Sequence, residues 1–284
     1  GFENCLTYFE KACLLLWPQG DPWTNHKNVV EHTCDCSGGT DGSSTFAKNP
    51  SFLLTNMGNA EAEIMIVLRK REEDIQHCPG WIQLHVHKGN DTGGMESERR
   101  YDVCPRNALF CTEKHYFGEA ALVFRLRENE RLQLTASASS YCTCTLTATS
   151  VDRFQLNPLP VSYTYTIEGT LCPTDPLNSS LILRNNNEER VEKLVVALSQ
   201  EPVRQRTHSV GLEVWLNRDS QSEDGHPRFI TEFRKDALVV FNFSLSLKRN
   251  EIVTFIPLAK RRLNTLPFSM SVYSSLPLQR EEAI

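Results

Sequence analysis

The sequence has no long apolar run and no large excess of charge of one sign, and these absences exclude several functions. Its 284 residues include 30 basic and 35 acidic side chains, a net charge of -5. Charge therefore gives no overall case for binding nucleic acid or an anionic membrane surface. The longest apolar stretches, such as 237–243, have the length of a β-strand, whereas a membrane-spanning helix needs about 20 apolar residues. We expect a protein that is not transmembrane and binds no nucleic acid.

Signals for targeting and for serine-type catalysis are also missing. The chain begins at Gly1 with neither an initiator methionine nor an apolar leader, which suggests a fragment excised from a longer protein. The pattern G-x-S-x-G, which holds a catalytic serine on a strained turn, does not occur. We therefore expect no catalytic residue in this chain.

The ten cysteines could form disulfides, but the composition does not require them. Small secreted proteins use disulfides because they lack a core, whereas 40% of this longer chain is hydrophobic. We interpret the cysteines as reduced thiols of a cytoplasmic protein. A secreted, disulfide-bonded sandwich is the alternative, because Asn90, Asn178 and Asn242 each begin an N-glycosylation acceptor pattern.

The spacing of apolar residues changes early in the chain. Apolar residues three and four apart over 2–13 predict a short amphipathic helix, which Pro18, Gly20 and Pro22 end. From Val29 onward apolar and polar residues alternate in short runs, which is typical of an all-β sandwich. We expect strands at 51–56, 63–71, 81–88, 108–113, 120–127, 131–136 and 143–150, and then at 162–167, 181–184, 193–201, 210–217, 228–234, 237–247, 251–257 and 268–273.

The second set of predicted strands repeats the first. The matched segments are 63–68 with 193–198, 80–84 with 211–215, 129–134 with 250–255, and 144–148 with 268–272. Pro158 and Pro160 interrupt the chain between the two sets. The sequence therefore predicts two tandem antiparallel β-sandwich domains, at 29–158 and 159–284, preceded by a short N-terminal helix and linker at 1–28.

Several segments resemble the calpain family. Residues 1–9 look like the last helix of its papain-like protease core, and 34–39 followed by 45–52 resemble the glycine-rich turn and first-strand motif of calpain domain III. Residues 255–258 and 266–275 are similar to that domain's closing strands. The resemblance implies a tandem of domain III sandwiches, an arrangement known among atypical calpains, with the catalytic residues of any protease core upstream of Gly1.

The resemblance also directs attention to an acidic loop that binds calcium in conventional family members. Here the corresponding segment offers only Glu61 and Glu63, and the second copy offers Glu188, Glu189 and Glu192. Calcium takes roughly six to eight oxygen ligands. We interpret the loop as degenerate and expect no cofactor, with calcium left open.

Basic residues form several short clusters. We expect contact with an anion or a partner at Lys260, Arg261 and Arg262, in a loop between the last two strands, and at Arg204 and Arg206. The cluster 69–71 is interpreted instead as a solvated face balanced by the acids at 72–74.

Cysteine and histidine pairs raise the question of a metal. Cys34 and Cys36 stand near His32, while the pairs Cys142/Cys144 and His85/His87 each place two side chains on one face of a strand. The two strand pairs could bind a metal if they met across the sandwich. We interpret the cysteines as core residues and the histidines as surface residues, and expect no metal.

These observations favour a non-catalytic regulatory or scaffolding unit. The resemblance implies that its partner is the protease-like core of its own protein or a cytoskeletal protein. A module that responds to calcium or phosphate and binds phospholipid is the alternative.

Overall fold

The computed structural model describes most of the chain. The described residues are 28–39, 42–77, 80–89, 99–101, 108–116, 118–160, 162–171, 179–200, 208–217, 227–260 and 266–281. The expected N-terminal helix lies outside them. No described helix is long and apolar enough to span a membrane.

The described chain is almost entirely β, which confirms the predicted fold class. The first half contains β1 (Asn28–Cys36), η1 (Phe46–Lys48), β2 (Ser51–Asn56), β3 (Ala62–Lys70), α3 (Glu72–His77), β4 (Ile82–Lys88), β5 (Phe110–Cys111), β6 (Glu119–Leu126), β7 (Arg131–Ala138), β8 (Cys142–Ser150) and β9 (Phe154–Pro158). The second contains β10 (Tyr163–Leu171), β11 (Leu181–Arg184), β12 (Val191–Gln200), β13 (Val210–Leu216), β14 (Phe229–Ile230), β15 (Leu238–Leu247), β16 (Ile252–Ala259), β17 (Leu266–Ser274) and β18 (Gln279–Glu281).

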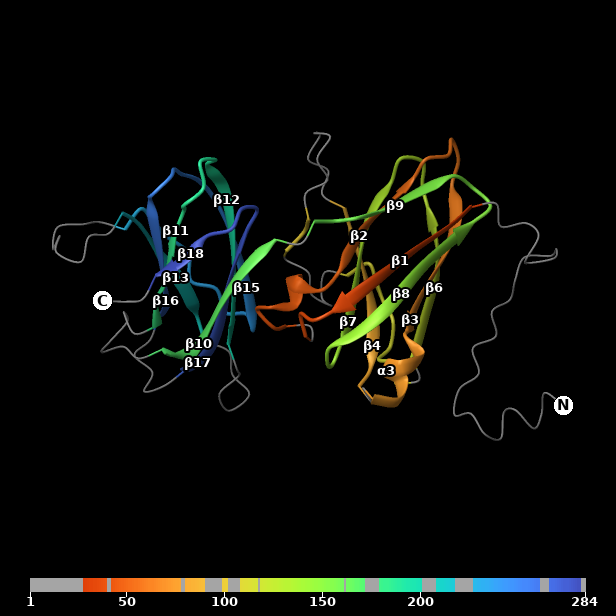
Figure 1. Cartoon of the computed structure of the whole chain (residues 1–284), viewed down its shortest axis with the longest axis horizontal. Coiled ribbons are helices and arrows are strands. Elements are labelled where there is room, and N and C mark those ends of the chain that lie inside the picture. Colours follow the sequence, from red (N-terminus) through yellow and green to blue (C-terminus); the bar gives the residue numbers. More distant parts are fainter. Residues whose placement is uncertain are drawn as a thin grey trace.

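Each half forms two antiparallel sheets with the same strand order. In the first half the orders are β1-β8-β3-β6 and β5-β4-β7-β2-β9, and in the second they are β10-β17-β12-β15 and β14-β13-β16-β11-β18. The two sandwiches lie side by side along the long axis of the molecule, with η1 between them (Figure 1). The tandem arrangement therefore consists of two copies of one topology.

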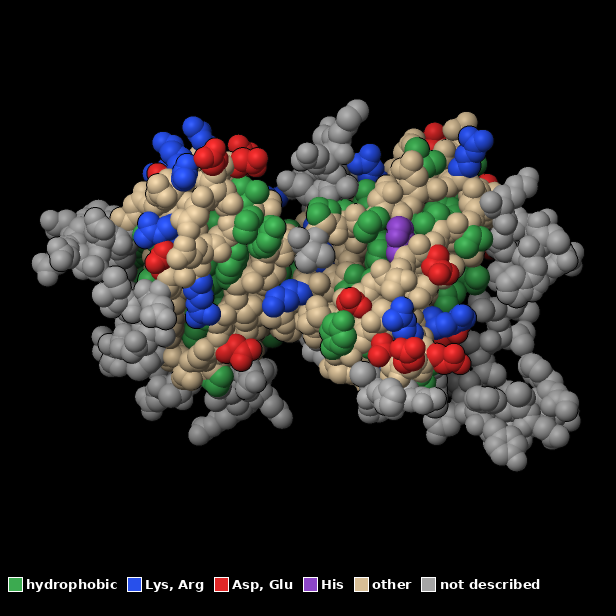
Figure 2. Space-filling model, in the orientation of Figure 1, with side chains coloured by type: hydrophobic (Ala, Val, Ile, Leu, Met, Phe, Trp, Pro, Cys, Tyr) green, Lys and Arg blue, Asp and Glu red, His purple; other side chains and the backbone are tan. Residues whose placement is uncertain are grey.

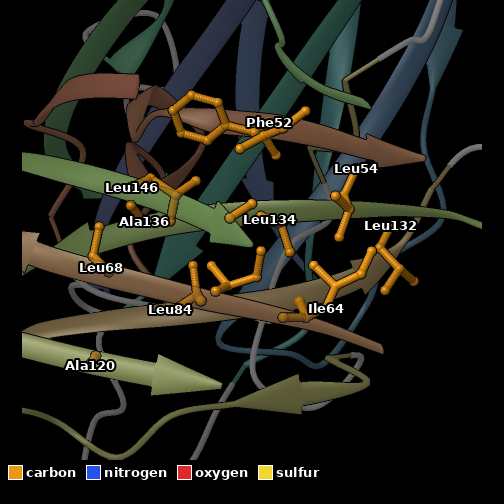
Figure 3. Close-up of a cluster of buried hydrophobic side chains, with 14 of the residues drawn as sticks. Phe52, Leu54, Ile64, Leu68, Leu84, Ala120, Leu132, Leu134, Ala136 and Leu146 are labelled. Carbon is orange, nitrogen blue, oxygen red and sulfur yellow. The ribbon is translucent and has the colours of Figure 1, made fainter. Parts of the chain in front are cut away.

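Apolar and polar residues alternate along the strands, so the apolar side chains point into the core of each sandwich. In β3 the buried residues are every second one, including Ile64, Ile66 and Leu68, because successive side chains in a strand point to opposite faces. They meet residues of the facing sheet such as Leu84 and Leu134 (Figure 3). Burial of this apolar area is the main favourable term in folding. The second sandwich has its own separate core.

The register shows where the predicted repeat was right and where it was wrong. Ile66 lies opposite Ala148, and Val196 opposite Val272, as the matched segments 63–68/193–198 and 144–148/268–272 require. The match of 80–84 with 211–215 is displaced by three residues. The residue equivalent to Leu84 is Leu212. The backbone amide of Leu84 donates to the hydroxyl of Thr112 at 3.0 Å, and that of Leu212 donates to the hydroxyl of Thr231 at 2.7 Å.

Several elements were not predicted, and each is either short or lacks an aliphatic inward face. The inward residues of β1 include His32, Cys34 and Cys36 in place of ordinary aliphatic residues. β9 and β18 are short edge strands, and β18 is polar throughout. The helix α3 is only six residues long and starts with three acids. Such segments give little periodic signal.

Candidate functional site

The predicted acidic loops place carboxylates beside arginines. Glu61 and Glu63 both lie 3.7 Å from the guanidinium of Arg125. In the second sandwich Glu188 lies 3.0 Å from Arg249, while Glu189 and Glu192 are exposed. Among the described residues these carboxylates do not form a group of three or more whose oxygens lie close enough together to hold a metal ion.

The predicted basic contact site falls mostly outside the described residues. Lys260 is exposed just after β16, and its amide donates to the carbonyl of Ser209 at 2.9 Å. Arg204, Arg206, Arg261 and Arg262 are not described. On the face seen in Figure 2, basic and acidic side chains are interspersed over both sandwiches.

The interpretation of 69–71 as a solvated cluster is wrong for its middle residue. Lys70 is only 2% exposed, and its ammonium group donates to the carbonyl of Gly80. Arg69 at the surface pairs with Glu119 at 3.1 Å. The lysine side chain points inward because it continues the buried row of β3.

The segment that carries the most specific resemblance, 34–52, builds the junction between the sandwiches. The side chain of Asn49 stabilises the turn at Gly38 and Gly39. Its oxygen accepts from the amide of Gly38, and its nitrogen donates to the carbonyl of Gly39, both at 2.9 Å. The hydroxyl of Thr45 donates to the carbonyl of Gly38 at 2.8 Å. These bonds place η1 between the sheets β5-β4-β7-β2-β9 and β10-β17-β12-β15.

On the second sandwich η1 meets an outward face that is buried. Ala47 packs in one cluster with Val195, Ala197 and Tyr273. The hydroxyl of Ser44 lies within hydrogen-bond distance of two β17 hydroxyls, of Ser269 at 2.7 Å and of Ser271 at 3.0 Å. Tyr273 donates its hydroxyl to the carbonyl of Ser44. Apolar contact and hydrogen bonds thus act together across the junction.

On the first sandwich η1 covers a layer of buried polar side chains. Phe46 contacts the ring of His85 edge to face at 5.1 Å. His85 is completely buried; its Nε2 lies 3.0 Å from the hydroxyl of Ser137 and its Nδ1 lies 3.4 Å from the Cys111 sulfur. His87 is buried beside it. The interpretation of both histidines as surface residues is therefore wrong, because the junction covers this face.

A buried arginine completes the junction. Arg99 is 5% exposed and donates to the carbonyls of Asn49 and, at 3.4 Å, Pro160. Burial lowers its pKa and raises that of Tyr273, whose ring lies 5.1 Å from Tyr101. Burial has this effect because it disfavours the charged form of each group.

The cysteine pairs of β1 and β8 meet in the core. Cys34 lies opposite Cys144 and Cys36 opposite Cys142. The sulfurs of Cys142 and Cys144 are 3.7 Å apart, and those of Cys36 and Cys144 are 4.0 Å apart. The thiols of Cys36, Cys142 and Cys144, which we call the thiol cluster, are buried, while Cys34 is partly exposed. All four are thiols and not disulfides.

Hydrogen bonds within the thiol cluster shift the pKa values of its members in opposite directions. Bonds from Cys144 and Cys36 lower the pKa of Cys142, and the charge of Lys70 acts in the same direction. The pKa values of Cys144 and Cys36 are raised, chiefly by their hydrogen bonds with Cys142.

The cysteine pairs are visible in the sequence, but the contact between the pair on β1 and the pair on β8 is not. The expected metal site would need the pair Cys142/Cys144 to meet the pair His85/His87 across the sandwich. The structure instead brings Cys142/Cys144 to Cys36, within the sheet that contains β1 and β8, and His85 lies on the outward face of the other sheet. Recognising β1 as a strand antiparallel to β8 would have revealed the contact.

Of the features that would mark a secreted protein, one acceptor asparagine and five of the ten cysteines lie in the described residues. Asn242 is exposed on β15, whereas Asn90 and Asn178 are not described. The five described cysteines carry no disulfide.

Comparisons with known proteins identify no family. No protein-family model matches the chain, and no curated protein matches it. Among solved structures, the tandem CBM22-1–CBM22-2 domains of Paenibacillus barcinonensis Xyn10C are 9% identical, with 88% of this chain and 92% of that chain covered and a TM-score of 0.26. The peptide N-glycanase F is 10% identical, with coverage of 88% and 97% and a TM-score of 0.25.

A third similar structure contains more than the matched part. It holds the M60 catalytic domain with the CBM51-1 and CBM51-2 domains of Clostridium perfringens ZmpB, at 7% identity and a TM-score of 0.24. The match covers 81% of this chain but only 34% of that chain. With TM-scores this low, none of these likenesses carries an argument about function.

Proposed function

We propose that the chain is a non-catalytic, cytoplasmic regulatory or scaffolding unit of a calpain-like protein. The observation that supports this most is the junction, where Ala47 and Ser44 of the first sandwich contact Tyr273 and Ser271 of the second. Domains joined by a linker alone move relative to each other by default, whereas a packed interface holds them in one arrangement. A fixed tandem would present two surfaces to a partner at a constant spacing.

The resemblance to calpain domain III supplies the proposed partner. The segment with the most specific resemblance, 34–52, contains the turn at Gly38 and the η1 residues that contact the second sandwich. We propose that the unit binds the protease-like core of its own protein, with a cytoskeletal protein as the alternative partner.

The phospholipid module has less support. A calcium-dependent lipid domain needs carboxylates that converge on the ion, whereas Glu61 and Glu63 face Arg125. Of the basic residues proposed to contact phosphate, Lys260 alone is described, and it is exposed.

Binding assays on the whole chain test the proposal. The purified chain is titrated against a calpain-type protease core, and sedimented with microtubules and separately with anionic vesicles, each with calcium and with chelator. We expect calcium-independent binding to the core or to microtubules, weakened about tenfold or more in Ala47→Glu, whose buried charge opens the junction. Lys48→Glu, on the same short helix but with a partly exposed side chain, is the matched control.

Two outcomes would contradict the proposal. One is binding to vesicles alone and only with calcium, which would favour the lipid module. The other is equal binding by the Ala47→Glu variant and the unmodified chain, since partner binding would then not depend on the fixed junction.

A further inference from the structure

We propose that the thiol cluster, together with Cys34, is a binding site for one thiophilic metal ion of the zinc class. Its three members each offer one sulfur, and these sulfurs all lie within 4.8 Å of one another. Thiolates are the ligands that zinc takes in its structural sites.

The distances between the sulfurs suit a tetrahedral ion. With zinc–sulfur bonds of about 2.3 Å, neighbouring ligands of a tetrahedron lie about 3.8 Å apart. Two of the three separations, 3.7 Å from Cys142 to Cys144 and 4.0 Å from Cys36 to Cys144, bracket this value, and the third, from Cys36 to Cys142, is within 4.8 Å. The ion would need only small shifts of these side chains, with each thiol releasing its proton to water.

Cys34 would supply the fourth ligand and the access route. It projects from the same face of β1 as Cys36 and lies opposite Cys144. Its sulfur is not among the three that lie within 4.8 Å of one another, so its side chain would have to turn toward them to complete the site. Cys34 is partly exposed, unlike the other three cysteines. An ion can therefore reach the buried sulfurs from the Cys34 side.

A buried cation balances the charge of such a site. Lys70 lies opposite Cys144 on β3 and is also on the inward face. Three thiolates around a divalent ion carry one net negative charge, and a fourth adds another, so a neighbouring ammonium group reduces the cost of burying the site.

The second sandwich provides an internal comparison. The register places Gly169, Leu171, Leu266 and Phe268 at the positions of Cys34, Cys36, Cys142 and Cys144. Gln200 stands at the position of Lys70, since it lies opposite Phe268 as Lys70 lies opposite Cys144. The same fold thus closes this end of the sandwich with apolar residues and a neutral amide, so packing does not require four thiols and a lysine.

Cadmium titration of the whole chain, kept reduced with a phosphine, tests the proposal. We expect the ultraviolet charge-transfer absorption of a cadmium thiolate to saturate at one ion per chain, and zinc to displace it. Cys142→Ala/Cys144→Ala should lose this signal, whereas Cys111→Ala, which removes a described thiol outside the cluster, should retain it.

A second measurement uses the unmodified chain alone and so does not depend on the folding of a variant. Bound zinc should protect Cys34 from alkylation and raise the midpoint of thermal unfolding by about 5–10 °C at a free ion concentration about 100 times Kd. Absence of a saturable cadmium signal in the unmodified chain would overturn the proposal. Retention of that signal by the double variant would overturn it as well.

Discussion

At the scale of single residues, two buried asparagines close equivalent turns in the two sandwiches. The side-chain amide of Asn56 donates to the carbonyls of Ala60, Leu126 and Arg127, and its oxygen accepts from the amide of Gly58. Asn185 makes the matching bonds to the carbonyls of Glu189 and Leu247 and from the amide of Asn187. Each side chain thus links several backbone groups of its turn.

Replacement of either asparagine should therefore destabilise the protein. Asn56→Ala and Asn185→Ala each remove the partner of one buried carbonyl and of several partly buried backbone groups, and we expect a loss of about 2 kcal/mol in the free energy of unfolding. Urea denaturation followed by circular dichroism measures it. The exposed Asn242→Ala should change stability by less than about 0.5 kcal/mol. A loss below 1 kcal/mol at Asn56 would show that water replaces the side chain.

At the scale of elements, the turn before η1 depends on one glycine. A Cβ added to Gly38 would lie 2.6 Å from the amide nitrogen of Asn49 and 2.7 Å from the carbonyl oxygen of Thr45. Both are backbone atoms, so the side chain cannot be accommodated without moving the segment that places η1.

We expect Gly38→Ala to cost about 1–3 kcal/mol through this overlap. Thermal unfolding measures the cost, and limited proteolysis should show faster cleavage of the segment between β1 and β2. Gly169→Ala, where the added Cβ would meet only the ring of Phe268 at 3.3 Å, is the control and should unfold as the unmodified chain does. Equal midpoints for the two variants would contradict the structural role of Gly38.

How far the sequence predicts an element depends on the chemistry of its inward face. The strands β2 and β11 were predicted at their observed bounds, since Leu54 and Leu183 mark an aliphatic inward face. The strand β1 was missed because its inward row holds His32, Cys34 and Cys36. The thiol cluster was missed with it, since two cysteine pairs far apart in the chain become neighbours only through strand pairing. The junction could not be foreseen, because contacts between domains leave no periodic pattern.

At the scale of the whole molecule, the two sandwiches share a junction that contains ionisable groups. Tyr273 is 2% exposed there, and its hydroxyl donates to the carbonyl of Ser44. Burial raises its pKa well above the ordinary value of 10.0. Ionisation of this hydroxyl in the folded protein would remove a donor and place a charge between the sandwiches.

The sign of the pH effect follows from this shift. The unfolded chain releases the Tyr273 proton near pH 10, while the folded chain retains it, so this residue's contribution to stability is complete below about pH 10 and is lost as pH rises further. We expect the unfolding midpoint of the unmodified chain to fall more steeply above pH 10 than that of Tyr273→Phe. Thermal unfolding at a series of pH values measures both slopes. Tyr141→Phe, whose side chain is exposed, should keep the steeper slope; equal slopes for all three proteins would contradict the argument.

The junction joins two different surfaces of the shared fold, so the two sandwiches are not arranged symmetrically. The first sandwich uses the outward side of its five-stranded sheet, and the second uses the outward side of its four-stranded sheet. In the terms of assembly symmetry the contact is heterologous, so no two-fold axis relates the halves. The register places Thr149 in the first sandwich at the position of Tyr273. The two sandwiches share a fold but are not interchangeable, and a chain with their order reversed would lack the tyrosine that the junction needs.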